Sequence, residues 1–188
     1  MFLISLRMVL IFTVISGFIY PIIITGGSWI FFHDNAEGNL VKINGVVIGS
    51  ELIGQQFDSV SYFHSRPSVI NYQPLPSGAS NMGWSDRRLK DAVASRKEAF
   101  IKENLLPDTT AIPSEMLFAS GSGIDPHISP RAAFLQVDRI TLSRNFTVEQ
   151  KNKLTRLIMD MTEKPQYTLF GEERINVFLL NLNLDKIE

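Results

Sequence analysis

The chain has 188 residues, with 18 Lys and Arg against 19 Asp and Glu, a formal net charge of −1 at pH 7 and no cysteine. A chain with this net charge does not have the excess of positive charge that nucleic-acid binding needs. Without cysteine it can form neither disulfides nor metal sites with thiolate ligands. His33, His64 and His127 lack the spacing of a metal site, and no phosphate-binding loop motif is present.

Residues 8–32 form an uncharged apolar run, MVLIFTVISGFIYPIIITGGSWIFF. A helix needs about 20 such residues to cross the hydrocarbon core of a membrane. Arg7 supplies positive charge at the near end, and Trp29 suits the aromatic belt at the far end. A cleaved signal peptide is the alternative, but its apolar core is typically about 7–15 residues and ends in a small-residue cleavage site. We therefore expect residues 1–7 in the cytoplasm, a transmembrane helix over 8–32 and one extracytoplasmic domain over 33–188.

Small and polar residues recur every three or four positions in this predicted helix, which places them on one face. Such a face lets a second helix approach closely in lipid. Pro21 removes one backbone donor and presses on the Gly17 carbonyl, so the sequence predicts a bend there. The candidate partner-helix face is Thr13, Ser16, Gly17, Tyr20 and Pro21. A lone membrane helix that tolerates these residues is the alternative.

The first predicted element after the anchor is a β-hairpin. Its strands, 40–43 and 46–48, flank Asn44-Gly45, a pair that favours a type I′ turn. Residues 67–83 are rich in Pro, Gly, Ser and Asn and predict a long loop. Capping by Ser85 or Asp86 then predicts a helix to about residue 104.

The second half of the chain alternates extended and helical patterns. Residues 116–119 predict a buried strand, and Ser129 with Pro130 predicts a helix through residue 140. A capping-box pattern at 147–150 predicts a helix over 148–161. Residues 175–185 suit a buried strand, although their length also permits a helix. Together these elements predict an α+β domain.

Residues 120–127, SGSGIDPH, contain serine, aspartate and histidine, the three residue types of a hydrolase triad. Triads are usually assembled from distant segments, and the G-x-S-x-G pattern is absent. Two glycines and an Asp-Pro pair instead favour a shaped turn that leads into the next helix. We expect no catalytic and no metal-binding residue, and a candidate docking turn of Ser120, Gly121, Ser122, Gly123, Asp125, Pro126 and His127.

The order and spacing of several short motifs resemble the C subunit of the bacterial and archaeal Kdp potassium-transporting ATPase. The resemblance runs almost from end to end, and residues 120–130 carry its most specific part. The motifs are Tyr20-Pro21 with Thr25-Gly26, Gly49-Ser50 to Phe57, Tyr62-Phe63, Arg66-Pro67-Ser68, Ser77-Gly78 to Gly83, Ser120 to Pro130, Ala132-Ala133, Gln136-Val137, Arg139, Asn176-Val177, Leu180-Asn181-Leu182 and Leu184-Asp185. Around Trp84 and residues 116–118 the chain departs from the family pattern.

The resemblance implies an accessory subunit of an ATP-driven, high-affinity potassium uptake complex in the prokaryotic cell (inner) membrane. Its implied partners are a channel-like A subunit, a phosphorylated P-type ATPase B subunit, a small F subunit and membrane lipid. The subunit needs no cofactor of its own, because ATP, magnesium and potassium act at the assembled complex. The family is described as raising the nucleotide affinity of the catalytic subunit, which an outer domain would do through a coupling free energy between sites. A stand-alone anchored hydrolase or ligand-binding domain is the alternative.

Overall fold

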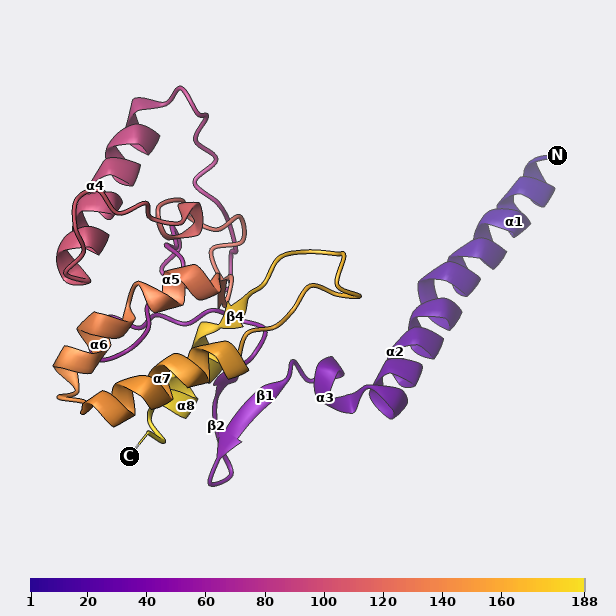
Figure 1. Cartoon of the computed structure of the whole chain (residues 1–188). Coiled ribbons are helices and arrows are strands. Elements are labelled where there is room, and N and C mark those ends of the chain that lie inside the picture. Colours follow the sequence, from indigo (N-terminus) through magenta and orange to yellow (C-terminus); the bar gives the residue numbers. More distant parts are fainter. Residues whose placement is uncertain (188) are drawn as a thin grey trace. The chain divides into compact units, whose positions relative to one another are not determined.

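The computed structural model describes residues 1–187 and divides into two compact units (Figure 1). The first unit is Met1–Ser50, and the second begins at Glu51. The first unit holds the apolar helix and the hairpin, although the sequence places the hairpin with the outer domain. The assignment of residues 33–188 to the extracytoplasmic side stays a prediction.

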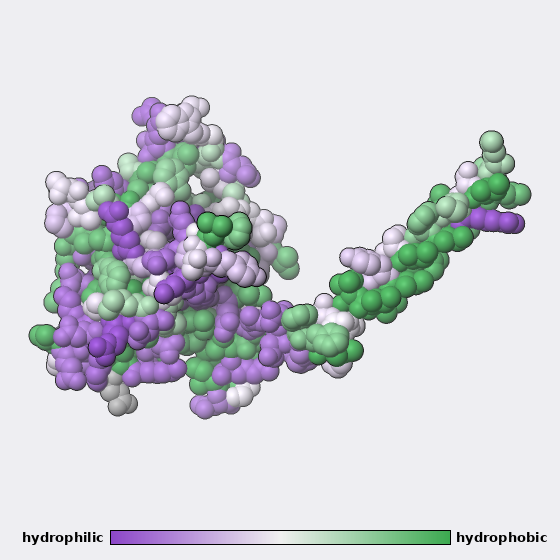
Figure 2. Space-filling view, turned by 45° about the vertical axis from the view of Figure 1, so that its right-hand side comes forward, coloured by the Kyte–Doolittle hydropathy of each residue, from purple (hydrophilic) through white to green (hydrophobic). Residues whose placement is uncertain are grey.

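The apolar segment is helical from Phe2 to Phe31, over 30 residues. It comprises α1 (Phe2–Val14), a π-helical segment (Ile15–Ile19) and α2 (Tyr20–Phe31). None of its residues is buried in the protein, and its surface is apolar along most of its length (Figure 2). By length and composition it is long enough to cross a membrane, and it begins six residues before the predicted span.

The π-helical segment ends at Ile19, two residues before Pro21. The N–H of Tyr20 donates to the carbonyl of Ile15, five residues earlier, in place of the usual partner four residues earlier. A proline ring conflicts with the carbonyl four residues before it, which here belongs to Gly17 inside the widened turn. The structure therefore accommodates Pro21 by widening one turn of a continuous helix.

The predicted hairpin is confirmed. After the short helix α3 (His33–Ala36), strands β1 (Leu40–Ile43) and β2 (Val46–Ser50) pair antiparallel, with Ile43 opposite Val46. Asn44 and Gly45 have φ values of 51° and 80°, as a type I′ turn requires.

The regular elements of the second unit are mostly helices. Its helices are α4 (Arg87–Glu103), the 3₁₀ turn η2 (Ser114–Met116), α5 (Pro130–Phe134), α6 (Val137–Ser143), α7 (Val148–Asp160) and α8 (Val177–Leu184). Helix α7 contacts α5, α6 and α8, and the buried side chains of these helices form the core with Phe63 and Ile175. Strands β3 (His127–Ile128) and β4 (Ile175–Asn176) form a short antiparallel pair.

Local chemistry fixes the start of four helices. Asp86, Ser129, Thr147 and Asn176 each accept a hydrogen bond from a backbone N–H in the first turn of the helix that follows. At α7 the predicted capping box is complete, because the Gln150 side chain also accepts from the Thr147 N–H at 2.8 Å. The helices predicted from Asp86 and from Thr147 are both confirmed.

The structure corrects two predictions and decides one alternative that the sequence leaves open. Residues 116–119 do not form a strand, because the N–H groups of Leu117 and Phe118 both donate to Ser114 and close a turn. The helix predicted from Ser129 to residue 140 is two helices, α5 and α6, which meet at Gln136. Residues 175–185 are extended only at Ile175–Asn176, because Asn176 caps a helix that is buried on most sides.

Candidate functional site

The segment 120–127 is a turn whose backbone is hydrogen-bonded to three points of one long connection, residues 51–86 between β2 (Val46–Ser50) and α4 (Arg87–Glu103). Its hydrogen bonds run from Ser120 N–H to Pro67 O (3.1 Å), from Gly78 N–H to Ser122 O (3.0 Å) and from Gly54 N–H to Ile124 O (2.7 Å). Ser120 is buried, and Ser122 is exposed. Backbone bonds at three separate points along this connection restrict the turn to one shape.

Of the two glycines in the turn, only Gly123 has a positive φ, at 75°. A Cβ on Gly123 would lie 2.4 Å from Cγ1 of Ile70 and 2.9 Å from the carbonyl oxygen of Gly78. A Cβ on Gly121 would meet nothing within 4 Å. The turn therefore requires glycine at Gly123 for both conformation and space.

Gly54 is a site residue that the sequence did not single out for this role. A Cβ there would lie 2.6 Å from the backbone oxygen of Asp125. This close approach lets the loop around Gly54 pack directly on the turn. The only sequence signal was its place in a motif that the family shares.

Asp125 is the polar centre of the turn. Its carboxylate accepts from Arg66 Nη1 at 2.8 Å and from the backbone N–H of His127 at 3.0 Å. Burial alone would raise the pKa of Asp125, but the bonds from His127 and Arg66 outweigh it, so the pKa lies below its usual range. Asp125 therefore stays charged and joins the turn to the loop that carries Arg66.

The end of the turn is held by the strand pair. His127 lies opposite Asn176, and the carbonyl of Pro126 accepts from the N–H of Val177 at 2.9 Å. The Asn176 side chain also donates to the carbonyl of Glu51 at 2.7 Å. Asn176 thus caps α8, pairs with the turn and holds a third segment, a combination that its position in the sequence does not reveal.

The serine and histidine of the turn have different partners. Ser122 Oγ accepts from the backbone N–H of Ile124 at 3.2 Å, and His127 Nδ1 lies 3.5 Å from Asp125 Oδ1. Within the described residues 1–187 no hydrogen bond joins Ser122 to His127. A nucleophile activated by a histidine base needs that contact, so the geometry supports a shaped surface better than a reacting centre.

A cleft of about 470 Å³ lies beside the turn. Arg66, Asp125 and His127 line it together with residues 172–174, which precede β4. Acidic and basic side chains both line this cleft together with Phe118 and Ile128, so its lining combines charges of both signs with apolar groups.

A buried polar network holds residues 60–64, the segment that leads to Arg66. Asn181 accepts from the N–H of Phe63 at 2.8 Å and donates to its carbonyl at 2.9 Å. Gln136 bonds both backbone groups of His64 in the same manner, at 2.8 and 3.3 Å. Arg139, only 4% exposed, donates to Asn104 and Gln136, each at 2.9 Å, and to the carbonyl of Val60. These amides replace the neighbouring strand that residues 60–64 lack.

The candidate partner-helix face lies in the first unit. Thr13 belongs to α1, Ser16 and Gly17 to the π-helical segment, and Tyr20 and Pro21 to α2. All five residues are exposed, and a Cβ on Gly17 would meet nothing within 4 Å. The Ser16 hydroxyl donates to the carbonyl of Phe12 within the same helix.

An apolar helix of membrane length followed by a small α+β unit is the organisation of a single-pass membrane protein. The family model described as "K+-transporting ATPase, c chain" matches residues 2–186, which include the apolar helix. The chain therefore belongs to the KdpC family.

Curated relatives agree with this assignment. The Potassium-transporting ATPase KdpC subunit of Mycobacterium bovis is 44% identical over 185 residues, 97% of this chain and 96% of the relative. The protein of the same name from Leptospira interrogans is 43% identical over 97% of this chain and 92% of the relative. That from Bacillus mycoides is 42% identical over 97% and 93%.

Proposed function

We propose that this chain is a non-catalytic accessory subunit that supports assembly of a potassium-transporting ATPase and its potassium-coupled ATP hydrolysis. The observation that carries the proposal is the turn at 120–127, whose shape is fixed by backbone bonds and whose Ser122 has no bond to His127 in the described chain. Such a turn serves contact with a partner, because it presents a fixed surface without an activated nucleophile.

The proposed complex has a channel-like A subunit, a phosphorylated B subunit and a small F subunit, with lipid around the apolar helix. ATP and magnesium would act at the B subunit and potassium along the transport path. This chain would hold no cofactor of its own. Any effect on nucleotide affinity would reach the catalytic subunit as a coupling free energy through the membrane subunits.

Ser122→Ala and His127→Ala should each leave potassium-stimulated ATPase activity of the purified complex within about twofold of wild type. Each change removes a side chain but keeps the backbone bonds of the turn. A catalytic serine or histidine would instead lose activity by orders of magnitude in an intact protein. ATPase rate and subunit retention are measured on the same preparation, and loss of turnover in a fully assembled variant would overturn the non-catalytic role proposed for this chain.

We also propose that the amino terminus lies in the cytoplasm and residues 33–188 on the outer side of the cell membrane. Arg7 lies in the second turn of α1, directly before the uncharged run 8–32, and Asp34 and Glu37 are the first charges after that run. A carboxyl-terminal alkaline phosphatase fusion should therefore be active, because that enzyme matures only after export. A carboxyl-terminal fluorescent reporter that folds only in the cytoplasm is the control, and its fluorescence would reverse the orientation.

The face that contains Gly17 is proposed to contact a helix of another subunit. Gly17→Leu should then reduce co-purification of the partner subunits severalfold, because a large side chain prevents close approach of two helices in lipid. Leu10→Ala, at an exposed position of α1, is the control. Equal recovery of the partners with Gly17→Leu and wild type would remove this face from the proposal.

A further inference from the structure

Residues Glu163–Arg174, between α7 and β4, form an arm that projects from the second unit (Figure 1). Backbone bonds between Glu163 and Arg174, at 2.8 and 3.1 Å, close its base, and their side chains form an ion pair at 2.9 Å. Near the tip, Gln166 and Phe170 exchange two further backbone bonds, each 2.9 Å. The arm is therefore an ordered, hairpin-like projection.

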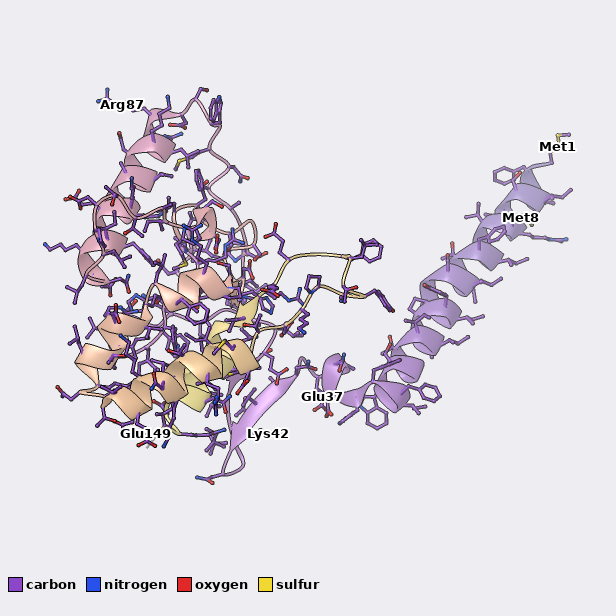
Figure 3. All side chains as sticks on the ribbon, in the orientation of Figure 1. Met1, Met8, Glu37, Lys42, Arg87 and Glu149 are labelled. Atoms are coloured by element: carbon purple, nitrogen blue, oxygen red, sulfur yellow. The ribbon has the colours of Figure 1, made fainter. Side chains whose placement is uncertain are left out.

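The tip of the arm carries large apolar side chains that do not join the core. Tyr167 is 90% exposed, Leu169 76% and Phe170 64%. Exposed loop tips are usually made of small or polar residues, so this composition is unexpected. Figure 3 shows that side chains at the end of the arm extend away from the helices of the second unit. The apolar group contributes little to folding of the second unit, which indicates a role in contact with another surface.

The backbone of the tip is strained. Tyr167 and Thr168 have φ values of 53° and 60°, in the left-handed region that aromatic and β-branched residues rarely adopt. Strain of this kind concentrates at functional sites, where the surrounding bonds hold it in place. The two pairs of backbone bonds in the arm provide that support.

The arm is continuous with the turn at 120–127. Its base leads into β4, and β4 pairs with His127–Ile128 at the end of the turn. Glu172 and Glu173 of the arm line the same cleft as Asp125. The arm and the turn therefore belong to one surface.

The charges of the arm indicate what kind of surface it meets. Glu163 and Arg174 form an ion pair, so their charges cancel. The remaining charged residues of the arm are one cation, Lys164, and two anions, Glu172 and Glu173. Membrane-surface binding relies on basic residues beside the apolar ones, because the lipid surface is negative. An acidic rim instead complements a protein surface that carries lysine or arginine around an apolar depression.

We propose that the apolar tip of the arm inserts into an apolar depression, rimmed by basic residues, on a membrane-embedded subunit of the same complex. This inference rests on the proposed function, because it takes that complex as the partner. Tyr167, Leu169 and Phe170 fill the depression, and Glu172 and Glu173 face its basic rim. The ordered, strained backbone presents these side chains in the bound conformation before contact.

The first test replaces Tyr167 with the photoreactive residue p-benzoylphenylalanine in the detergent-solubilised complex. Irradiation should give a covalent adduct of this chain with one membrane subunit. The same residue at Arg156, exposed on α7, is the control and should give less than about a tenth of that adduct. An adduct only with lipid, an adduct between two copies of this chain, or no adduct would each overturn the proposal.

The second test uses the combined variant Tyr167→Ser, Leu169→Ser and Phe170→Ser. It should lower retention of this chain in the purified complex at least about fivefold while its circular dichroism stays that of wild type. Leu142→Ser with Met159→Ser, two exposed apolar residues of α6 and α7, is the matched control and should be retained. Equal retention of both variants would overturn the arm's role alone, whereas failure of the wild-type chain to co-purify would overturn the proposed function.

Discussion

Arg139→Ala is expected to lower the free energy of unfolding of the second unit by about 3–5 kcal/mol, because buried partners lose hydrogen bonds to a charged group. Arg139 donates to Asn104, Gln136 and the carbonyl of Val60, and alanine leaves these oxygens with fewer donors or none. For a unit of this size the melting temperature should fall by roughly 10 °C. Thermal unfolding of the full chain in detergent, followed by circular dichroism, measures the change.

Arg156→Ala is the matched control for Arg139→Ala. Arg156 is exposed on α7, and its loss should change the free energy of unfolding by no more than about 0.5 kcal/mol. Equal melting temperatures for the two variants would show that the buried network around Arg139 contributes little to stability.

Gly123→Val is expected to destabilise the second unit by about 3 kcal/mol, because two costs add at one position. Valine is strained at a φ of 75°, and its Cβ would lie 2.4 Å from Ile70 and 2.9 Å from the backbone oxygen of Gly78. The turn should therefore lose its shape, and the chain should dissociate from its complex. Chemical denaturation of the full chain and subunit retention measure the two effects.

Gly121→Val is the control at the other glycine of the turn. Gly121 has open space around its Cβ position, so its replacement should cost less than about 1 kcal/mol. If the Gly121 variant proves as unstable as the Gly123 variant, the turn is sensitive to any side chain, and the positive φ of Gly123 is not the cause.

The sequence predicts those parts of the fold that depend on neighbouring residues. Asn44-Gly45 sets the hairpin turn, Asp86 and Thr147 set the starts of α4 and α7, and the uncharged run sets the apolar helix. Each feature follows from chemistry within a few positions along the chain. All of them are present in the structure.

The parts that the sequence does not predict depend on distant partners. Residues 177–184 form a helix whose Asn181 bonds the backbone of Phe63, although their composition also suits a strand. The break between α5 and α6 lies at Gln136, whose side chain bonds residue 64. No local pattern reveals either contact.

The candidate site shows the same limit. The glycine-rich motif identifies the turn itself, but Arg66, Gly54 and Asn176 join it from loops and elements that are distant in sequence. Family motifs mark all three residues without indicating that they meet. Only the folded structure shows that these three residues meet at the turn.

The widened turn before Pro21 has a consequence for how the membrane helix meets its surroundings. A π-helical turn inserts one additional residue, and one residue corresponds to about 100° of rotation around a helix axis. Side chains of α2 are therefore turned by that angle relative to an uninterrupted continuation of α1. A stripe of residues along α1 and α2 therefore does not run straight along this helix, and its two halves face directions that differ by this angle.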